Sequence, residues 1–150
     1  MLTSRKLKNR WGMFAYYTAL LAVMALCFLG IGMLISAIAR STDMAQGAAF
    51  MVWLTLLLFL DLILLGIMIQ GRVAPEIAVG IALANPLQVF RTAALALFDP
   101  QLIVLGPSAF VILDTFGVLG YKIFALAYPS ALGILAAAVG YFIFRRGDLP

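Results

Sequence analysis

Histidine is missing from this chain of 150 residues, and cysteine occurs once, at Cys27. A zinc site of the His/Cys type and an intramolecular disulfide are therefore excluded. A nucleophile activated by histidine is excluded for the same reason. The glycine-rich P-loop motif that cradles nucleotide phosphates is also missing, so any ATP hydrolysis is expected on a separate polypeptide. We expect no catalytic residues, no cofactor and no metal site in this chain.

Charged residues are scarce as well. They make up 11% of the chain, against about 25% in soluble domains, while hydrophobic residues make up 65%. The net charge is +4, but the basic residues stand at the ends of apolar segments rather than in one cluster. This placement predicts contacts with lipid head groups and control of membrane topology, and it argues against a nucleic-acid partner.

Three long apolar stretches occupy approximately residues 14–39, 48–70 and 122–144. A bilayer core about 30 Å thick needs about 20 helical residues to cross it. We therefore predict an all-α, polytopic membrane protein with three transmembrane helices in a single membrane domain, residues 1–150. Residues 1–13 form a basic lead-in, and the apolar run after it is too long for a signal peptide, so we expect a retained span.

Local signals refine these spans. Arg40 ends the first span and Ser41-Thr42-Asp43 is a helix N-cap signal, so the first two spans are predicted to form an antiparallel hairpin. Close helix packing is predicted from the spacing of small residues in the first and third spans: Gly32 and Ser36, then Gly133, Ala136, Ala137 and Gly140. We expect Pro129 to kink the third helix or to begin its straight part.

Residues 73–121 are mostly apolar but are interrupted by prolines and charges. No stretch there reaches the length of a span without such an interruption. We predict short amphipathic or re-entrant helices at the membrane interface. Asn85 is expected to cap one of them, with Pro86 in its first turn.

Three segments carry a family resemblance. Residues 28–36 with Ala39-Arg40-Ser41 form a span ending and a short loop, and Leu60-Asp61-Leu62 lies in the next span. The third segment combines residues 85–91 (NPLQVFR) with residues 144–149 (FRRGDL). Through these segments, most of residues 14–149 resembles the C-terminal half of an ABC-2 type permease. Within that superfamily it is most similar to the NosY-like membrane subunits of transporters that help mature nitrous oxide reductase.

The resemblance implies spans four to six of a six-span permease in the bacterial inner membrane, so the chain is expected to be part of a larger reading frame. It implies three protein partners, namely a P-loop ATPase subunit, a second permease copy in a homodimer, and a periplasmic maturation protein. The implied activity is export of a cargo for a copper-sulfide site. The alternatives are an ABC-2 permease for another cargo and a small membrane assembly factor or anchor that transports nothing.

Topology is a point of conflict. The family places the C-terminus and the loop at residues 40–46 in the cytoplasm, which leaves residues 1–13 outside. Arg40, Arg145 and Arg146 agree with this orientation, whereas the four basic residues at positions 5–10 argue for the opposite one. We expect the orientation of the family.

Three groups of residues are candidates for function. Asp61 is a lone acid in an apolar stretch. Such residues face a bundle interior or a wet cavity. We expect Asp61 either to line a cargo path or dimer interface or to make a structural hydrogen bond. The second group is the loop with Arg40, Ser41 and Asp43, which is expected either to contact the ATPase subunit or to be only a tight turn. The third group consists of Glu76, Asn85, Arg91 and Asp99. These residues are expected either to form a docking surface for a periplasmic partner or to keep amphipathic helices at the membrane interface.

Overall fold

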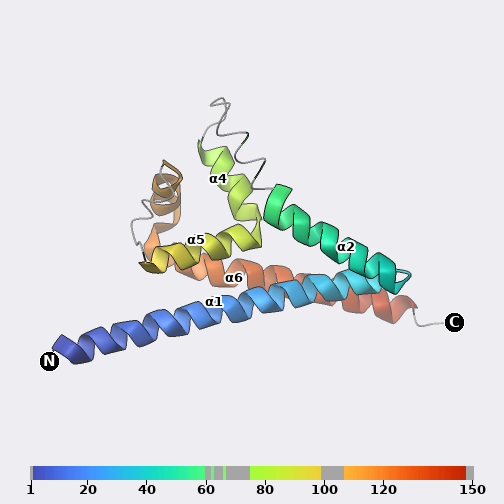
Figure 1. Cartoon of the computed structure of the whole chain (residues 1–150), viewed down its shortest axis with the longest axis horizontal. Helices are drawn as coiled ribbons and strands as arrows, with labels where there is room; N and C mark the ends of the chain where they lie inside the picture. Colours follow the sequence, from blue (N-terminus) through green and yellow to red (C-terminus); the bar gives the residue numbers. More distant parts are fainter. Residues whose placement is uncertain (1, 60–61, 63–65, 67–74, 99–106, 148–150) are drawn as a thin grey trace.

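The computed structural model describes residues 2–59, 62, 66, 75–98 and 107–147. Every regular element in these ranges is helical, which confirms the prediction of an all-α chain. The elements are α1 (Leu2–Ile38), α2 (Thr42–Leu54), the π-helical turn η1 (Thr55–Phe59), α4 (Pro75–Ala84), α5 (Pro86–Phe98) and α6 (Pro107–Gly147) (Figure 1).

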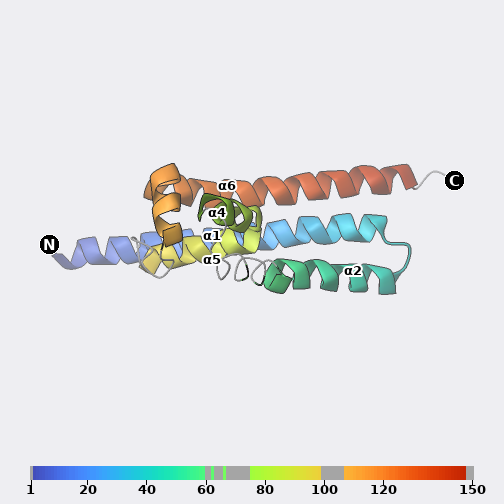
Figure 2. The same ribbon diagram turned by 90° about the horizontal axis from the view of Figure 1, so that it is seen from above.

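Two long helices, α1 and α6, form the body of the molecule. They lie side by side and run in the same direction, so their C-terminal ends are at the same end of the molecule (Figures 1 and 2). Their segments Arg10–Ile38 and Asp114–Arg146 are long and apolar enough to cross a membrane. Only 17% and 28% of their most apolar windows are buried within the chain. Extensive exposed apolar surface of this kind suits contact with lipid or with further helices.

The contact between α1 and α6 depends on small residues. A Cβ atom on Gly133 would lie 2.7 Å from the Cα of Cys27, and one on Gly140 would lie 3.0 Å from the Cα of Leu34. A Cβ on Gly30 would collide with the Gly133 carbonyl. The predicted packing of Gly133 and Gly140 is confirmed, because only residues this small let two backbones approach so closely.

Gly32 and Ser36, the predicted pair of small residues in α1, take no part in the contact between α1 and α6. Both residues are exposed, and no atom that the structure describes lies within 4 Å of a Cβ built on Gly32. Successive helical residues are about 100° apart, so Gly30 and Gly32 point to different faces of α1. The face that meets α6 carries Cys27, Gly30 and Leu34 instead.

The two long helices are in a constant register. The Tyr16 hydroxyl donates a hydrogen bond of 3.0 Å to the Lys122 carbonyl, a partner 106 residues away. The contacts of Cys27 with Gly133 and of Leu34 with Gly140 join residues separated by the same 106 positions. A residue of α6 is therefore level with the residue of α1 numbered 106 lower.

A short turn joins α1 to α2, which runs back along α1 (Figure 1). The Ser41 side chain accepts a hydrogen bond of 3.2 Å from the Met44 backbone N–H, so it caps α2 as predicted. The antiparallel hairpin is likewise confirmed. The predicted span at residues 48–70 is helical through residue 59, and apart from residues 62 and 66 the remainder lies outside the described residues.

Helix α5 packs lengthwise on α1 and α6 rather than lying flat across their ends (Figures 1 and 2). One side of it is buried, through Pro86, Val89, Thr92, Ala93, Ala96 and Leu97. Its neighbours in the core include Leu20 of α1 and Tyr121 and Ala125 of α6. This packing favours the re-entrant alternative for the region between the second and third predicted spans.

The first turns of α6 point away from the rest of the helix (Figure 2). The bend is at Gly117, whose φ of 64° and ψ of 168° are not helical. A positive φ is readily available only to glycine. The straight part of α6 thus begins after Gly117, earlier than the predicted start near Lys122, and the buried Pro129 lies within it. The expectation that Pro129 begins the straight part was wrong.

Candidate functional site

The junction between α4 and α5 is held by one buried asparagine. Asn85 is 2% exposed, and its side-chain oxygen accepts a hydrogen bond of 3.0 Å from the Leu87 backbone N–H. It therefore caps α5, with Pro86 in the first turn, as predicted. Its amide nitrogen donates a hydrogen bond of 2.6 Å to the Leu56 carbonyl in η1. One side chain thus connects α5 to the end of the α2 segment.

Tyrosines of α6 satisfy other backbone groups at this junction. The Tyr128 hydroxyl donates a hydrogen bond of 2.6 Å to the Ala84 carbonyl, which is one of the free carbonyls at the end of α4. The buried Tyr121 hydroxyl donates to the Val89 carbonyl of α5 at 3.4 Å. Both short helices are therefore attached to α6 by side-chain hydrogen bonds.

The junction lies deep along the long helices. By the register of 106 residues, Tyr128 is level with residue 22 of α1. That position is about 12 Å inside the apolar run that begins at residue 14, at 1.5 Å per helical residue. Broken backbone at such depth is tolerated only where protein satisfies its polar groups. Among the described residues, no buried side-chain nitrogen or oxygen lacks a hydrogen-bond partner.

Exposed basic residues gather at the end of the molecule where α1 and α6 terminate. The turn between α1 and α2 lies at the same end as the C-terminus of α6 (Figure 1). Arg40 is in this turn, and Arg145 and Arg146 are in the last turn of α6; all three are exposed. Asp43 is exposed in the first turn of α2, where its negative charge interacts favourably with the positive end of the helix dipole.

Comparison with known proteins gives the family. The profile described as "ABC-2 family transporter protein" matches residues 7–149, nearly the whole chain. The chain belongs to the ABC-2 transporter family. No curated protein and no solved structure matched it. As an ABC-2 family membrane protein it is a permease and not a catalytic subunit, and members of this family pair with ATPase subunits.

Five of the residues predicted to serve this ABC-2 permease lie between positions 61 and 99 of the sequence. Asp61 and Asp99 lie outside the described residues, and Glu76 is on α4 with its side chain outside them. Arg91 is exposed on α5, and its guanidinium group is 3.4 Å from the Gln88 side-chain oxygen. Asn85 is buried at the helix junction, so its side chain is not available to a docking surface.

The tyrosine hydrogen bonds of the ABC-2 permease were not predicted from its sequence. Tyr16 is half-buried, and its hydroxyl group donates a hydrogen bond to α6. Tyr121 and Tyr128 stand in an apolar helix, where a hydroxyl group needs a partner. The sequence therefore indicated that these hydroxyl groups would form hydrogen bonds. The partner carbonyls could be identified only from the packing of the helices.

Proposed function

We propose that the chain supplies the last three spans of an ABC-2 export permease, formed by α1, the segment that begins with α2, and the straight part of α6. The family match over residues 7–149 carries this proposal. The arrangement of helices supports it, because α1 and α6 are long and apolar and the shorter helices α4 and α5 pack against this pair (Figure 1). In a six-span permease, such spans would pack against three others and against a second copy of the permease.

We further propose that the basic end faces the cytoplasm of a bacterium and that the inner membrane holds the protein. Arg40, Arg145 and Arg146 support this orientation through the positive-inside rule. The α4–α5 hairpin would then open toward the extracytoplasmic side. The basic residues at positions 5–10 oppose this orientation, but in a longer permease the upstream spans would contribute to topology as well.

The proposed mechanism couples ATP-driven closure of the ATPase subunits to movement of the spans. The turn with Arg40, Ser41 and Asp43 would receive the ATPase, since it joins two spans directly. Movement of α2 would reach the re-entrant hairpin through the Asn85–Leu56 hydrogen bond. The hairpin would in turn move together with α6 through Tyr128. The permease would exist in two conformational states. ATP binding would shift their populations to the extent that ATP binds one state more tightly than the other.

Co-purification tests the proposal that this chain works with an ATPase. A co-expressed P-loop ATPase subunit of the same transporter should remain bound in mild detergent, and Asp43→Cys in a Cys27→Ala background should crosslink to it. Thr115→Cys, exposed near the other end of α6, is the matched control. An ATPase that never co-purifies, or equal crosslinking from both positions, would contradict the proposal.

For Asp61 we propose a place on the cargo path. The support is its position as the only acid among residues 48–70, since intramembrane acids cost about 2.5–3.5 kcal/mol to insert and are kept at wet or interior positions. Asp61→Asn should preserve assembly with the ATPase and abolish transport. Unchanged transport would leave only the structural hydrogen bond as its role.

For the cargo we propose a NosY-like role, on the sequence similarity of residues 85–91 and 144–149. A periplasmic maturation protein would dock at a surface that includes Glu76 of α4, Arg91 of α5 and Asp99, the residue after α5 in the sequence. Deletion of the gene in a denitrifying host should yield nitrous oxide reductase that lacks the absorption bands of its copper-sulfide site. A reductase with normal bands would show that the permease carries a different cargo.

A further inference from the structure

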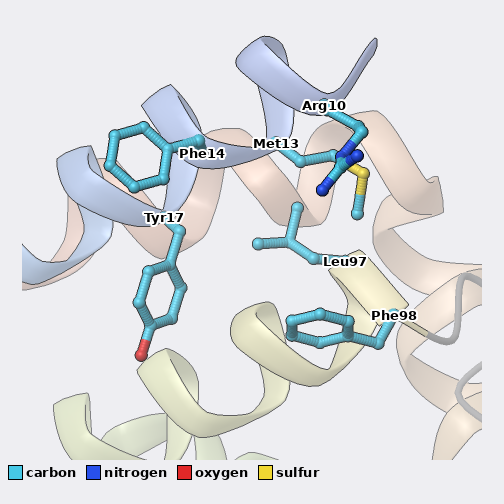
Figure 3. A pocket seen from close by; sticks show the side chains of 6 residues that line it. All are labelled: Arg10, Met13, Phe14, Tyr17, Leu97 and Phe98. Atoms are coloured by element: carbon cyan, nitrogen blue, oxygen red, sulfur yellow. The ribbon is translucent and has the colours of Figure 1, made fainter. Parts of the chain in front are cut away.

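A cleft lies between the N-terminal part of α1 and the C-terminal part of α5. It encloses about 240 Å³ (Figure 3). Its lining consists of Arg10, Met13, Phe14, Tyr17, Leu97 and Phe98. This volume is below the range of about 300–1,000 Å³ that holds a whole drug-sized ligand. The cleft therefore suits one part of a longer, flexible molecule.

The cleft is at the boundary between apolar and polar surface. Arg10 is the last basic residue before the apolar run that begins at residue 14. Trp11 and Phe14 are exposed beside it and touch edge to face. Aromatic and basic residues gather in this way at the level of lipid head groups. A ligand in the cleft would have its polar end at Arg10 and its apolar end along the helices.

On the α1 side of the cleft, the charges are of one sign. Among the described residues that line the cleft, Arg10 is the one that carries a charge, and the chain has no acidic residue before Asp43. Arg5, Lys6 and Lys8 precede Arg10 in the first turns of α1. A guanidinium group binds phosphate oxygens through charge-assisted hydrogen bonds. The site therefore suits an anionic head group attached to an apolar chain.

We propose that this cleft binds one anionic phospholipid, with the lipid phosphate at Arg10 and the start of an acyl chain between α1 and α5. Met13 and Leu97 form the apolar walls, and the exposed Phe98 closes one side (Figure 3). A lipid in this position contacts both the first long helix and the end of the re-entrant hairpin. It stabilises the contact between the two elements.

Lipid retention by the purified permease, in complex with its ATPase, tests this proposal. After delipidation, the complex is titrated with phosphatidylglycerol or phosphatidylcholine and bound lipid is counted by native mass spectrometry. Both lipids offer a phosphate to Arg10, but the choline cation of phosphatidylcholine offsets the charge of its phosphate, so phosphatidylglycerol should bind about tenfold more tightly. Arg10→Gln should remove most of that preference, whereas Met13→Trp should reduce binding of both lipids by filling the cleft.

Arg145→Gln is the matched control, because it removes one exposed arginine at the opposite end of the molecule. It should leave the preference unchanged; an equal loss in both arginine variants would overturn the proposal in favour of general surface charge. Photocrosslinking from benzoylphenylalanine in place of Phe98, which is 81% exposed, identifies the occupant. A lipid adduct supports the proposal, and an adduct with another protein chain overturns it.

Discussion

Asn85 illustrates how much can depend on a single polar residue in apolar surroundings. Where α4 ends and α5 begins, backbone groups lose their helical partners, and each unsatisfied group costs several kcal/mol away from water. Asn85 pairs with two such groups, the Leu87 N–H and the Leu56 carbonyl. An amide can do this because it carries both a donor and an acceptor.

Replacement of this residue should reveal that double role. Asn85→Leu leaves both backbone groups without a partner and should lower the free energy of unfolding by about 2–4 kcal/mol. Asn85→Ser keeps the cap on Leu87 but is too short to reach Leu56, so its loss should be about half as large. Thermal unfolding in detergent measures both. Equal Tm values for the two variants would show that the cap on Leu87 contributes little, and an Asn85→Ser variant with an unchanged Tm would show that the bond to Leu56 contributes little.

The two long helices illustrate packing between elements. Because α1 and α6 approach through glycine backbones, an added methyl group cannot be accommodated without moving a helix. Gly133→Ala should therefore lower the free energy of unfolding by about 1–3 kcal/mol, the range for overpacking. Gly32→Ala is the matched control, since its Cβ has open space around it among the described residues. A comparable loss in Tm for Gly32→Ala would contradict this account of the contact.

The bend in α6 depends on a different property of glycine. No atom of the described residues lies within 4 Å of a Cβ built on Gly117, so its requirement is conformational: its φ of 64° is unfavourable for other residues. Gly117→Ala should cost about 1–2 kcal/mol. Gly120→Ala in the straight helix, where a Cβ would be 3.8 Å from the Phe116 Cβ, should be neutral or stabilising. Unfolding of both variants, followed by circular dichroism, checks the difference.

The whole molecule is organised by the parallel direction of α1 and α6, which puts the basic α1–α2 turn and the C-terminus of α6 at one end. In membranes, a maleimide that cannot cross the bilayer should label Asp43→Cys and Arg146→Cys from the same side. It should label Trp11→Cys from the other side, in a Cys27→Ala background. Labelling of Trp11→Cys and Asp43→Cys from one side would contradict a membrane-spanning α1.

Much of the molecule was predictable from local patterns. The Ser41 and Asn85 caps depend on hydrogen bonds within three residues, and the length of an apolar run sets its capacity to span a bilayer. The glycine spacing in α6 also indicated a packing face. Gly32 and Ser36 had the same spacing without that contact, because spacing alone does not say which face meets a partner.

Local chemistry along the chain was therefore enough to predict a helical membrane protein with short helices at the proline-rich interruption, and the resemblance of its segments to ABC-2 permeases indicated the family. Packing in three dimensions was needed for the rest: the register of 106 residues, the carbonyl partners of Tyr16, Tyr121 and Tyr128, and the cleft at Arg10. These features join residues far apart in the chain. Their geometry follows from how closely whole helices can approach, which no single segment encodes.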